Sequence, residues 1–93
     1  MDKSWNQYLN KMVLLKNGTG GGQYEGIFAG VKNGKIYLDR CFPIGYYAKN
    51  NVYQTVYRIS HGEKRRFDVS KATITVIADG LVEFFKMKGY PGY

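Results

Sequence analysis

The sequence predicts one small, mostly-β domain: a strongly bent barrel of five strands with a helix at the N-terminus and a short helix at the C-terminus. Three observations predict it. Apolar and polar residues alternate over short runs, as they do in half-buried strands. Asn-Gly turn signals and a glycine-rich loop separate these runs. Glycines also interrupt the runs themselves, which is typical of bulges at the corners of small barrels.

The first segment, residues 3–11, predicts an amphipathic helix. Ser4 and Gln7 form the Ser-x-x-Gln pattern of a capping box at its start. The apolar residues that share one helical face are Trp5, Tyr8, Leu9 and Met12. This spacing indicates a lid of about two turns that packs its apolar stripe against the strands.

The barrel strands are expected within residues 12–77. The first strand begins at Met12 and runs into the turn Asn17-Gly18, which residues 19–22 extend into a glycine-rich loop. Neither the Gly-Lys-Ser/Thr of a phosphate-binding motif nor a helix follows this loop, so we assign it no nucleotide.

Residues 24–31 predict the second strand, with Gly26 and Gly30 as the points where it bends. Alternation divides its apolar residues between two faces, with Ile27, Ala29 and Val31 on one and Tyr24 and Phe28 on the other. Glu25 is expected to face water or to pair with a lysine or arginine.

The turn Asn33-Gly34 leads into a third strand over residues 35–42. Its alternation sets Ile36 and Leu38 against Tyr37 and Asp39. Asp39, like Glu25, is expected to face water or a cationic side chain.

The second half of the chain predicts an exposed loop at residues 43–51, because proline, glycine and paired asparagines break the pattern there. The elements expected next are strands over residues 52–60, 65–69 and 72–77, with a hairpin turn at residues 61–64. Asp79 is placed to cap a closing helix over residues 79–88, on which Leu81, Phe84 and Phe85 share a face. Residues 89–93 form a tail.

The chain is strongly basic. Fourteen Lys and Arg against seven Asp and Glu give a net charge of +7 and a pI near 9.6. This excess favours a polyanionic partner, with nucleic acid ahead of an anionic membrane surface. Nine tyrosines supply rings on which bases stack, although most are expected to fill half-buried strand positions.

The longest apolar runs are four or five residues, far short of the roughly 20 that a membrane span needs. The N-terminal residues also lack the features of a secretory signal. No membrane association is therefore expected, and the location predicted by default is cytoplasmic.

The single cysteine and single histidine exclude an intrachain disulfide and a cysteine-rich metal site. Cys41 lies in an apolar strand and is expected to be a buried packing residue in a reducing compartment. His61 is expected in a solvated, charged turn. The acidic residues fall at no spacing typical of a catalytic pair, so we expect no enzyme activity and no cofactor.

The order of these elements resembles the two signatures of the Sm-like (Lsm) family. The first is carried by the N-terminal helix, the strand that ends at Asn17-Gly18, and the strands at residues 24–31 and 36–41. Residues 69–77 resemble the second, shorter signature. Together the two cover about half of the chain.

The resemblance implies a five-stranded Sm-like barrel, related to SH3-like barrels, with the helix across its open end. It also implies a ring of about five to eight copies in which the fourth strand of one subunit pairs with the fifth of the next. Here those strands are residues 52–60 or 65–69, and residues 72–77. Covering two exposed edge strands also stabilises so small a domain.

The chain departs from the family at two motifs. Members that bind uridine-rich RNA carry Asp-x-x-Met-Asn after the second strand, where this chain has residues 31–35, and only Asn33 is equivalent. The family's Arg-Gly before the last strand is replaced by Ser70-Lys71, which keeps a cation without the flat guanidinium. The chain is therefore identified as a divergent member.

The candidate nucleic-acid-binding residues fall into three groups. They are Lys32, Asn33, Lys35, Ser70 and Lys71 on one rim, Lys64, Arg65 and Arg66 in a basic hairpin, and Tyr46 and Tyr47 with Lys49 in the loop. The first hypothesis is a homo-oligomeric ring that binds single-stranded RNA, in which identical weak sites share one effective concentration. Two alternatives stay open: a monomeric DNA-binding SH3-like barrel that uses the tyrosine face of residues 52–60, and a structural oligomer of viral or mobile-element origin.

Overall fold

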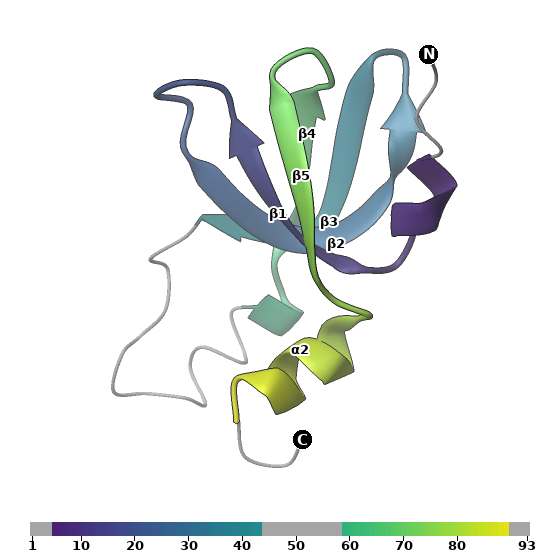
Figure 1. The fold of residues 1–93 in the computed structure, drawn as a ribbon, viewed down its shortest axis with the longest axis vertical. Coiled ribbons are helices and arrows are strands. Elements are labelled where there is room, and N and C mark those ends of the chain that lie inside the picture. Colours follow the sequence, from purple (N-terminus) through teal and green to yellow (C-terminus); the bar gives the residue numbers. More distant parts are fainter. Residues whose placement is uncertain (1–4, 44–58, 90–93) are drawn as a thin grey trace.

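The computed structural model of the protein describes residues 5–43 and 59–89. Within these residues, five antiparallel strands form one sheet in the order β4-β3-β2-β1-β5 (Figure 1). In chain order the elements are the 3-10 helix η1 (Trp5–Tyr8), β1 (Met12–Asn17), β2 (Gln23–Lys32), β3 (Lys35–Pro43), β4 (Glu63–Asp68), β5 (Ala72–Ala78) and α2 (Leu81–Met87). The prediction of a mostly-β fold with five strands is confirmed.

Strand β2 bends at the two glycines singled out in the sequence. The β2–β3 register skips Gly26 and shifts again immediately before Gly30, so both predicted bulges are present. A Cβ atom on Gly26 would lie 3.0 Å from the carbonyl oxygen of Asp39 and 3.1 Å from the Cα of Cys41. A side chain here would therefore require the two strands to move apart by a few tenths of an ångström, which glycine avoids.

The bend curls the sheet until side chains from both of its edges share one apolar core. The buried members of this first cluster are Val13, Leu15, Phe28, Ile36, Leu38, Cys41 and Phe67. Phe67 comes from the edge strand β4, and Ile74 of the opposite edge strand β5 packs against the same cluster. A flat sheet would hold these two residues apart on opposite sides of three strands.

A second apolar cluster joins the sheet to α2, which lies beyond the strands in Figure 1. It consists of Met12, Phe42, Ile59, Phe84 and Phe85. Phe84 and Phe85 are buried and Leu81 packs against them, so the predicted apolar face of this helix is confirmed. The helix is shorter than residues 79–88.

Asp79 does not cap α2 as expected. The N-cap is Gly80, which is extended and makes no side-chain capping bond. Asp79 instead forms an ion pair of 3.2 Å with Lys11, because the chain leaving β5 passes the start of β1. The register pairs Ala78 with Met12, next to Lys11.

The N-terminal lid is a single 3-10 turn and not a helix over residues 3–11, of which the first two lie outside the described residues. The ring of Trp5 stacks on Phe28 at 6.0 Å, and the ring of Tyr8 lies 5.6 Å from Phe28. Asn10 then adopts a left-handed conformation (φ 64°), which ends the helix. Leu9 is consequently exposed rather than part of the stripe.

Strict alternation assigned one residue of β2 to the wrong face. Phe28 is fully buried in the first cluster, and Val31, expected on the opposite face, packs against that same cluster. The bulge before Gly30 inserts one extra residue, which reverses the alternation beyond it. Ile36 and Leu38 of β3 are fully buried as predicted.

The strand expected at residues 52–60 is contradicted at its end. Residues 52–58 lie outside the described residues, but Ile59 and Ser60 are helical, and Ile59 is fully buried in the second cluster. The turn that follows is short, so β4 already begins at Glu63. A Cβ atom on Gly62 would lie 2.7 Å from the carbonyl carbon of Arg40, which explains why glycine occupies this close approach.

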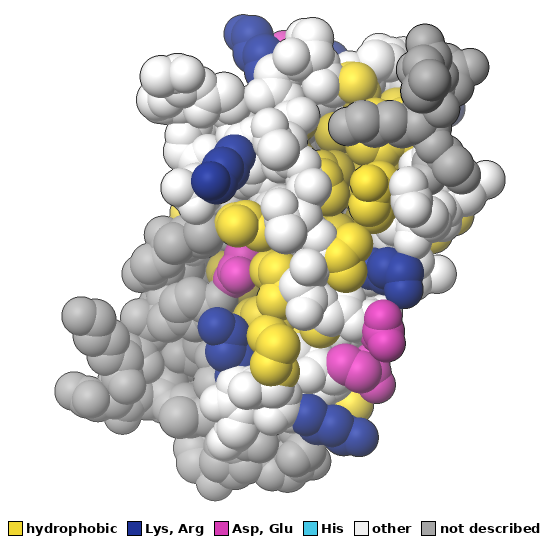
Figure 2. Space-filling view, in the orientation of Figure 1, with side chains coloured by type: hydrophobic (Ala, Val, Ile, Leu, Met, Phe, Trp, Pro, Cys, Tyr) yellow, Lys and Arg dark blue, Asp and Glu magenta, His cyan; other side chains and the backbone are white. Residues whose placement is uncertain are grey.

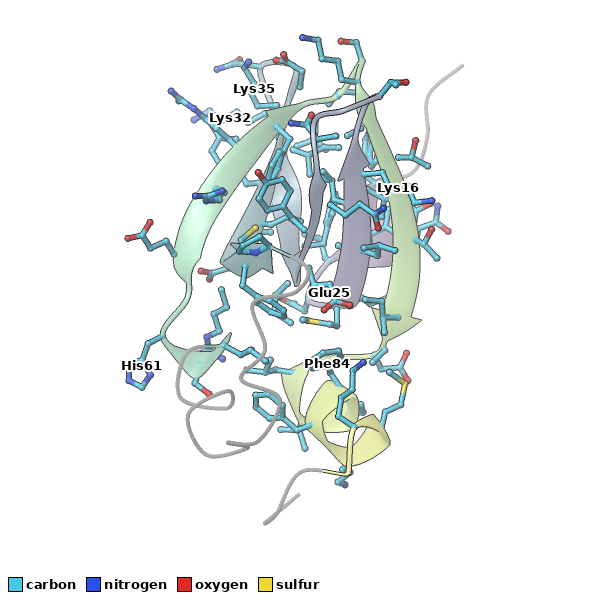
Figure 3. All side chains as sticks on the ribbon, turned by 90° about the vertical axis from the view of Figure 1, so that its left-hand side faces the viewer. Lys16, Glu25, Lys32, Lys35, His61 and Phe84 are labelled. Atoms are coloured by element: carbon cyan, nitrogen blue, oxygen red, sulfur yellow. The ribbon has the colours of Figure 1, made fainter. Side chains whose placement is uncertain are left out.

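Glu25 is buried and does not face water, so of its two expected placements only the pairing with a lysine or arginine stays a prediction. On β2 it lies opposite Leu14 of β1 and Phe42 of β3. Figure 3 shows Glu25 between the strands and Phe84 of α2. The alternation of β2 correctly placed Glu25 away from the Tyr24 face, but it gave no indication that α2 covers the face on which Glu25 lies.

We expect the substitution Gly26→Ala to lower the free energy of unfolding by about 1–3 kcal/mol, because the new methyl group would meet backbone atoms of β3 that cannot rotate away. Ala29→Ser adds one atom to an exposed position of the same strand and should change stability by less than about 0.5 kcal/mol. Urea denaturation measures both. Equal losses would show that the close approach at Gly26 is not required.

Candidate nucleic-acid interface

Three turns of the sheet meet at one end of the fold (Figure 1). They are residues 17–22, 33–34 and 69–71, and we call this end the turn rim. The Val69 N–H donates a hydrogen bond of 3.0 Å to the Gly34 carbonyl oxygen, which joins the second turn to the third. Asn17 pairs with Ala72, which joins the first turn to the third. The bend in β2 makes this possible, because it carries both ends of the strand to the same side.

The turn rim collects the cations that the sequence assigned to it. Lys32 and Lys35 flank the second turn, while Ser70 and Lys71 lie exposed in the third. Figure 3 shows Lys32 and Lys35 at this end, with Lys16 across from them. Lys16 was not singled out in the sequence. The signal for it was its place one residue before the Asn17-Gly18 turn.

Asn33 has a structural role in this rim. Asn33 and Gly34 both adopt left-handed conformations, with φ of 52° and 75°. Two such residues in succession are typical of the type I′ hairpin turn that Asn-Gly favours.

One acidic side chain moderates the charge of the turn rim. Lys35 donates a hydrogen bond to Asp68 and forms an ion pair with it. This hydrogen bond, with the charge of Lys35, holds the pKa of the Asp68 carboxyl below its usual value. Lys32 and Lys71 are both exposed.

The three cations of the basic hairpin lie on the edge strand β4, which includes Lys64 although the turn was expected to extend to residue 64. Arg66 pairs with Tyr37 of β3 across the outer face of the sheet. The guanidinium of Arg65 lies over the ring of Tyr24 at 5.3 Å, and that ring contacts Phe67 at 5.0 Å. Lys64, Arg65 and Arg66 are all exposed, and all three line one depression beside Tyr37.

Cys41 and His61 do not contribute a reactive centre to the turn rim. Cys41 is buried as predicted, and burial raises the pKa of its thiol to about 11 although the charge of Arg65 opposes this. The thiol therefore stays protonated, and a protonated thiol is a poor nucleophile. His61 is exposed and lies at the opposite end of the fold from Lys32 and Lys35 (Figure 3).

Tyr37 is a residue that the sequence analysis did not treat as functional. It lies on β3 between Gly30 of β2 and Arg66 of β4. Its alternation with buried residues showed that it faces outward, but its neighbours across the sheet depend on the register. Tyr46, Tyr47 and Lys49 of the third candidate group lie outside the described residues.

In the part of the chain that the structure describes, no group of three or more His, Cys, Asp or Glu side chains is placed to hold a metal ion. None of the helices in residues 5–43 and 59–89 has the length and hydropathy needed to cross a bilayer. Comparisons with protein-family models, with curated proteins and with solved structures find no match to the chain.

Proposed function

We propose that the protein is a non-catalytic nucleic-acid-binding protein with an Sm-like barrel, which assembles into a ring and binds single-stranded RNA at the turn rim. The observation that carries this proposal is the hydrogen bond between Val69 and Gly34. It brings the turn that contains Lys71 against the turn flanked by Lys32 and Lys35, in a chain of net charge +7.

The curled sheet is evidence for the proposed barrel. Its two edge strands contribute Phe67 and Ile74 to one core, as the strands of a small barrel do. The η1 turn packs its aromatic rings on Phe28 and so covers part of this core, in keeping with the lid that the family resemblance implies.

The two edge strands favour the proposed ring. β5 exposes Val76, which is 41% accessible, and Figure 2 shows hydrophobic side chains forming a band down the face on which β5 lies. An exposed apolar edge strand gains stability when another strand pairs with it. The partner in a neighbouring copy is β4, at the opposite edge of the sheet.

The chemistry of the turn rim favours contacts to phosphates over the reading of bases. Lysine ammonium groups attract phosphate as point charges, whereas bidentate base recognition needs guanidinium or amide groups. Lys71 stands where uridine-binding relatives have arginine, and Asn33 occupies a tight turn. We therefore propose binding that tolerates many RNA sequences and depends strongly on salt.

A monomeric DNA-binding barrel is the second candidate, because Lys64 and Arg66 are exposed on the sheet itself. A monomer that prefers duplex DNA to single-stranded RNA would favour this candidate. A stable oligomer that binds neither nucleic acid would favour a structural role.

We expect short oligouridylate and oligoadenylate strands to bind with similar affinities. The affinity should fall about tenfold or more between about 50 and 200 mM salt, because each phosphate contact releases a condensed counterion. Fluorescence anisotropy with labelled strands measures both effects. Absence of binding at the lower salt concentration, or binding that salt leaves unchanged, would contradict the proposal.

Two Lys–Asp pairs among the described residues, Lys35–Asp68 and Lys11–Asp79, supply a matched control for this assay. Asp68→Asn removes a negative charge from the turn rim and should tighten binding about two- to fivefold at low salt. Asp79→Asn removes the same charge from the pair beside α2 and should leave binding unchanged. Equal effects of the two variants would show that only the net charge matters.

We expect the free protein to have the mass of about five to eight subunits, as the paired edges of a ring require. Light scattering coupled to size exclusion measures this mass. Val76→Pro, which removes an N–H from the free edge of β5, should yield smaller species. A wild-type monomer would contradict the ring and bring the DNA-binding barrel forward.

A further inference from the structure

We propose that the outer face of β3 at Tyr37 is a second RNA contact, separate from the turn rim, on which one base of a single strand stacks. This inference rests on the proposed function, since it concerns a strand already bound at the rim. It adds a stacking contact between one base and the Tyr37 ring, which attraction between charges alone does not provide.

The position of Tyr37 is set by its neighbours along β3. Ile36 and Leu38 are both fully buried, so Tyr37 between them faces out of the core. The side chain is half-buried because β2 and β4 flank it on both sides. A ring held in this way loses little further conformational entropy when it binds a base.

Gly30 leaves room beside the ring. It pairs with Tyr37 across the β2–β3 ladder, and a Cβ atom on Gly30 would meet no atom within 4 Å. A depression of about 310 Å³ lies on this side, lined by Lys32 and Lys64 together with Tyr37 and Gly30. A second depression of about 460 Å³, on the side of Arg66, is also lined by Tyr37 and Lys64.

The charges around Tyr37 are those that a nucleic-acid backbone requires. Lys32, Lys64 and Arg66 surround the ring on β2 and β4. The acidic residues on these three strands are the buried Glu25 of β2, Asp39 of β3 and the pair Glu63 and Asp68 of β4. Asp39 accepts a hydrogen bond from the Arg40 backbone N–H, and Asp68 pairs with Lys35. An aromatic ring with cations on either side is the arrangement that binds single strands, since a base stacks while its phosphates contact the cations.

A single strand fits this surface better than the other candidate occupants. The bases of a duplex are already stacked on one another and have no free face for Tyr37. An apolar peptide would place its side chains against three cations. Lys32 belongs to both surfaces, because it ends β2 at the turn rim and lines the depression beside Tyr37. A strand that leaves the rim therefore passes over the ring.

The test compares Tyr37→Phe with Tyr37→Thr, because phenylalanine keeps the ring, whereas threonine removes it but is itself well suited to a strand. The probes are a short oligouridylate and an abasic strand of the same length, which has the phosphates without the bases. We expect Tyr37→Phe to bind oligouridylate like the wild type and Tyr37→Thr to bind it at least about fivefold more weakly. All three proteins should bind the abasic strand equally, and their melting temperatures identify any loss of folding.

Two outcomes overturn the Tyr37 site while leaving the proposed function intact: unchanged oligouridylate binding by Tyr37→Thr, or an equal loss for both probes. If Tyr37→Thr alters the mass of the protein free of RNA, this face is a contact between copies and the inference is wrong. If the wild type binds no single strand at all, the proposed function is wrong, and the Tyr37 site is wrong with it. If Tyr37→Thr fails to fold, a strand that contains 4-thiouridine can be crosslinked to the wild-type protein instead. Absence of the Tyr37 peptide among the crosslinked peptides would overturn the site.

Discussion

The close approach of β2 and β3 at Gly26 is the constraint on which the rest of the structure depends. Backbone atoms of Asp39 and Cys41 lie only 3.0 and 3.1 Å from the position that a Cβ atom at residue 26 would take. Where two strands come so close, the sheet bends, and the bulge before Gly30 increases the bend. The curled sheet then gathers apolar residues from all five strands into one core that a chain of this length can fill.

The same bend assembles the candidate binding surface. Both ends of β2 point to one side, so the turns that contain Gly18, Gly34 and Ser70 become neighbours, and lysines far apart in the sequence share a rim. The rim lacks guanidinium groups and contains one acidic partner, Asp68. In the proposed function, the rim would attract phosphate without discriminating among bases. The proposed stacking on Tyr37 would favour single strands over duplexes.

Local patterns predicted the fold well where local chemistry determines it. Gly26 and Gly30 marked the bulges, Asn33-Gly34 marked the hairpin, and Cys41 lay where alternation expected a buried residue. The sequence analysis failed where distant parts of the chain decide. Glu25 is buried because α2 covers its face, and Ile59 is helical although its neighbours favour strands. The position of Tyr37 beside Gly30 and Arg66 depends on register, which no local pattern contains.

The most direct test of this account is amide hydrogen–deuterium exchange of the protein with and without saturating oligouridylate. We expect RNA to slow exchange in residues 32–37 and 64–71, which contain two of the three turns of the turn rim and the face around Tyr37, and to leave α2 unchanged. Slower exchange confined to α2 and the opposite end of the fold, or no change in either region under conditions where RNA binds, would contradict the central claim that the bent β2 strand builds the nucleic-acid surface.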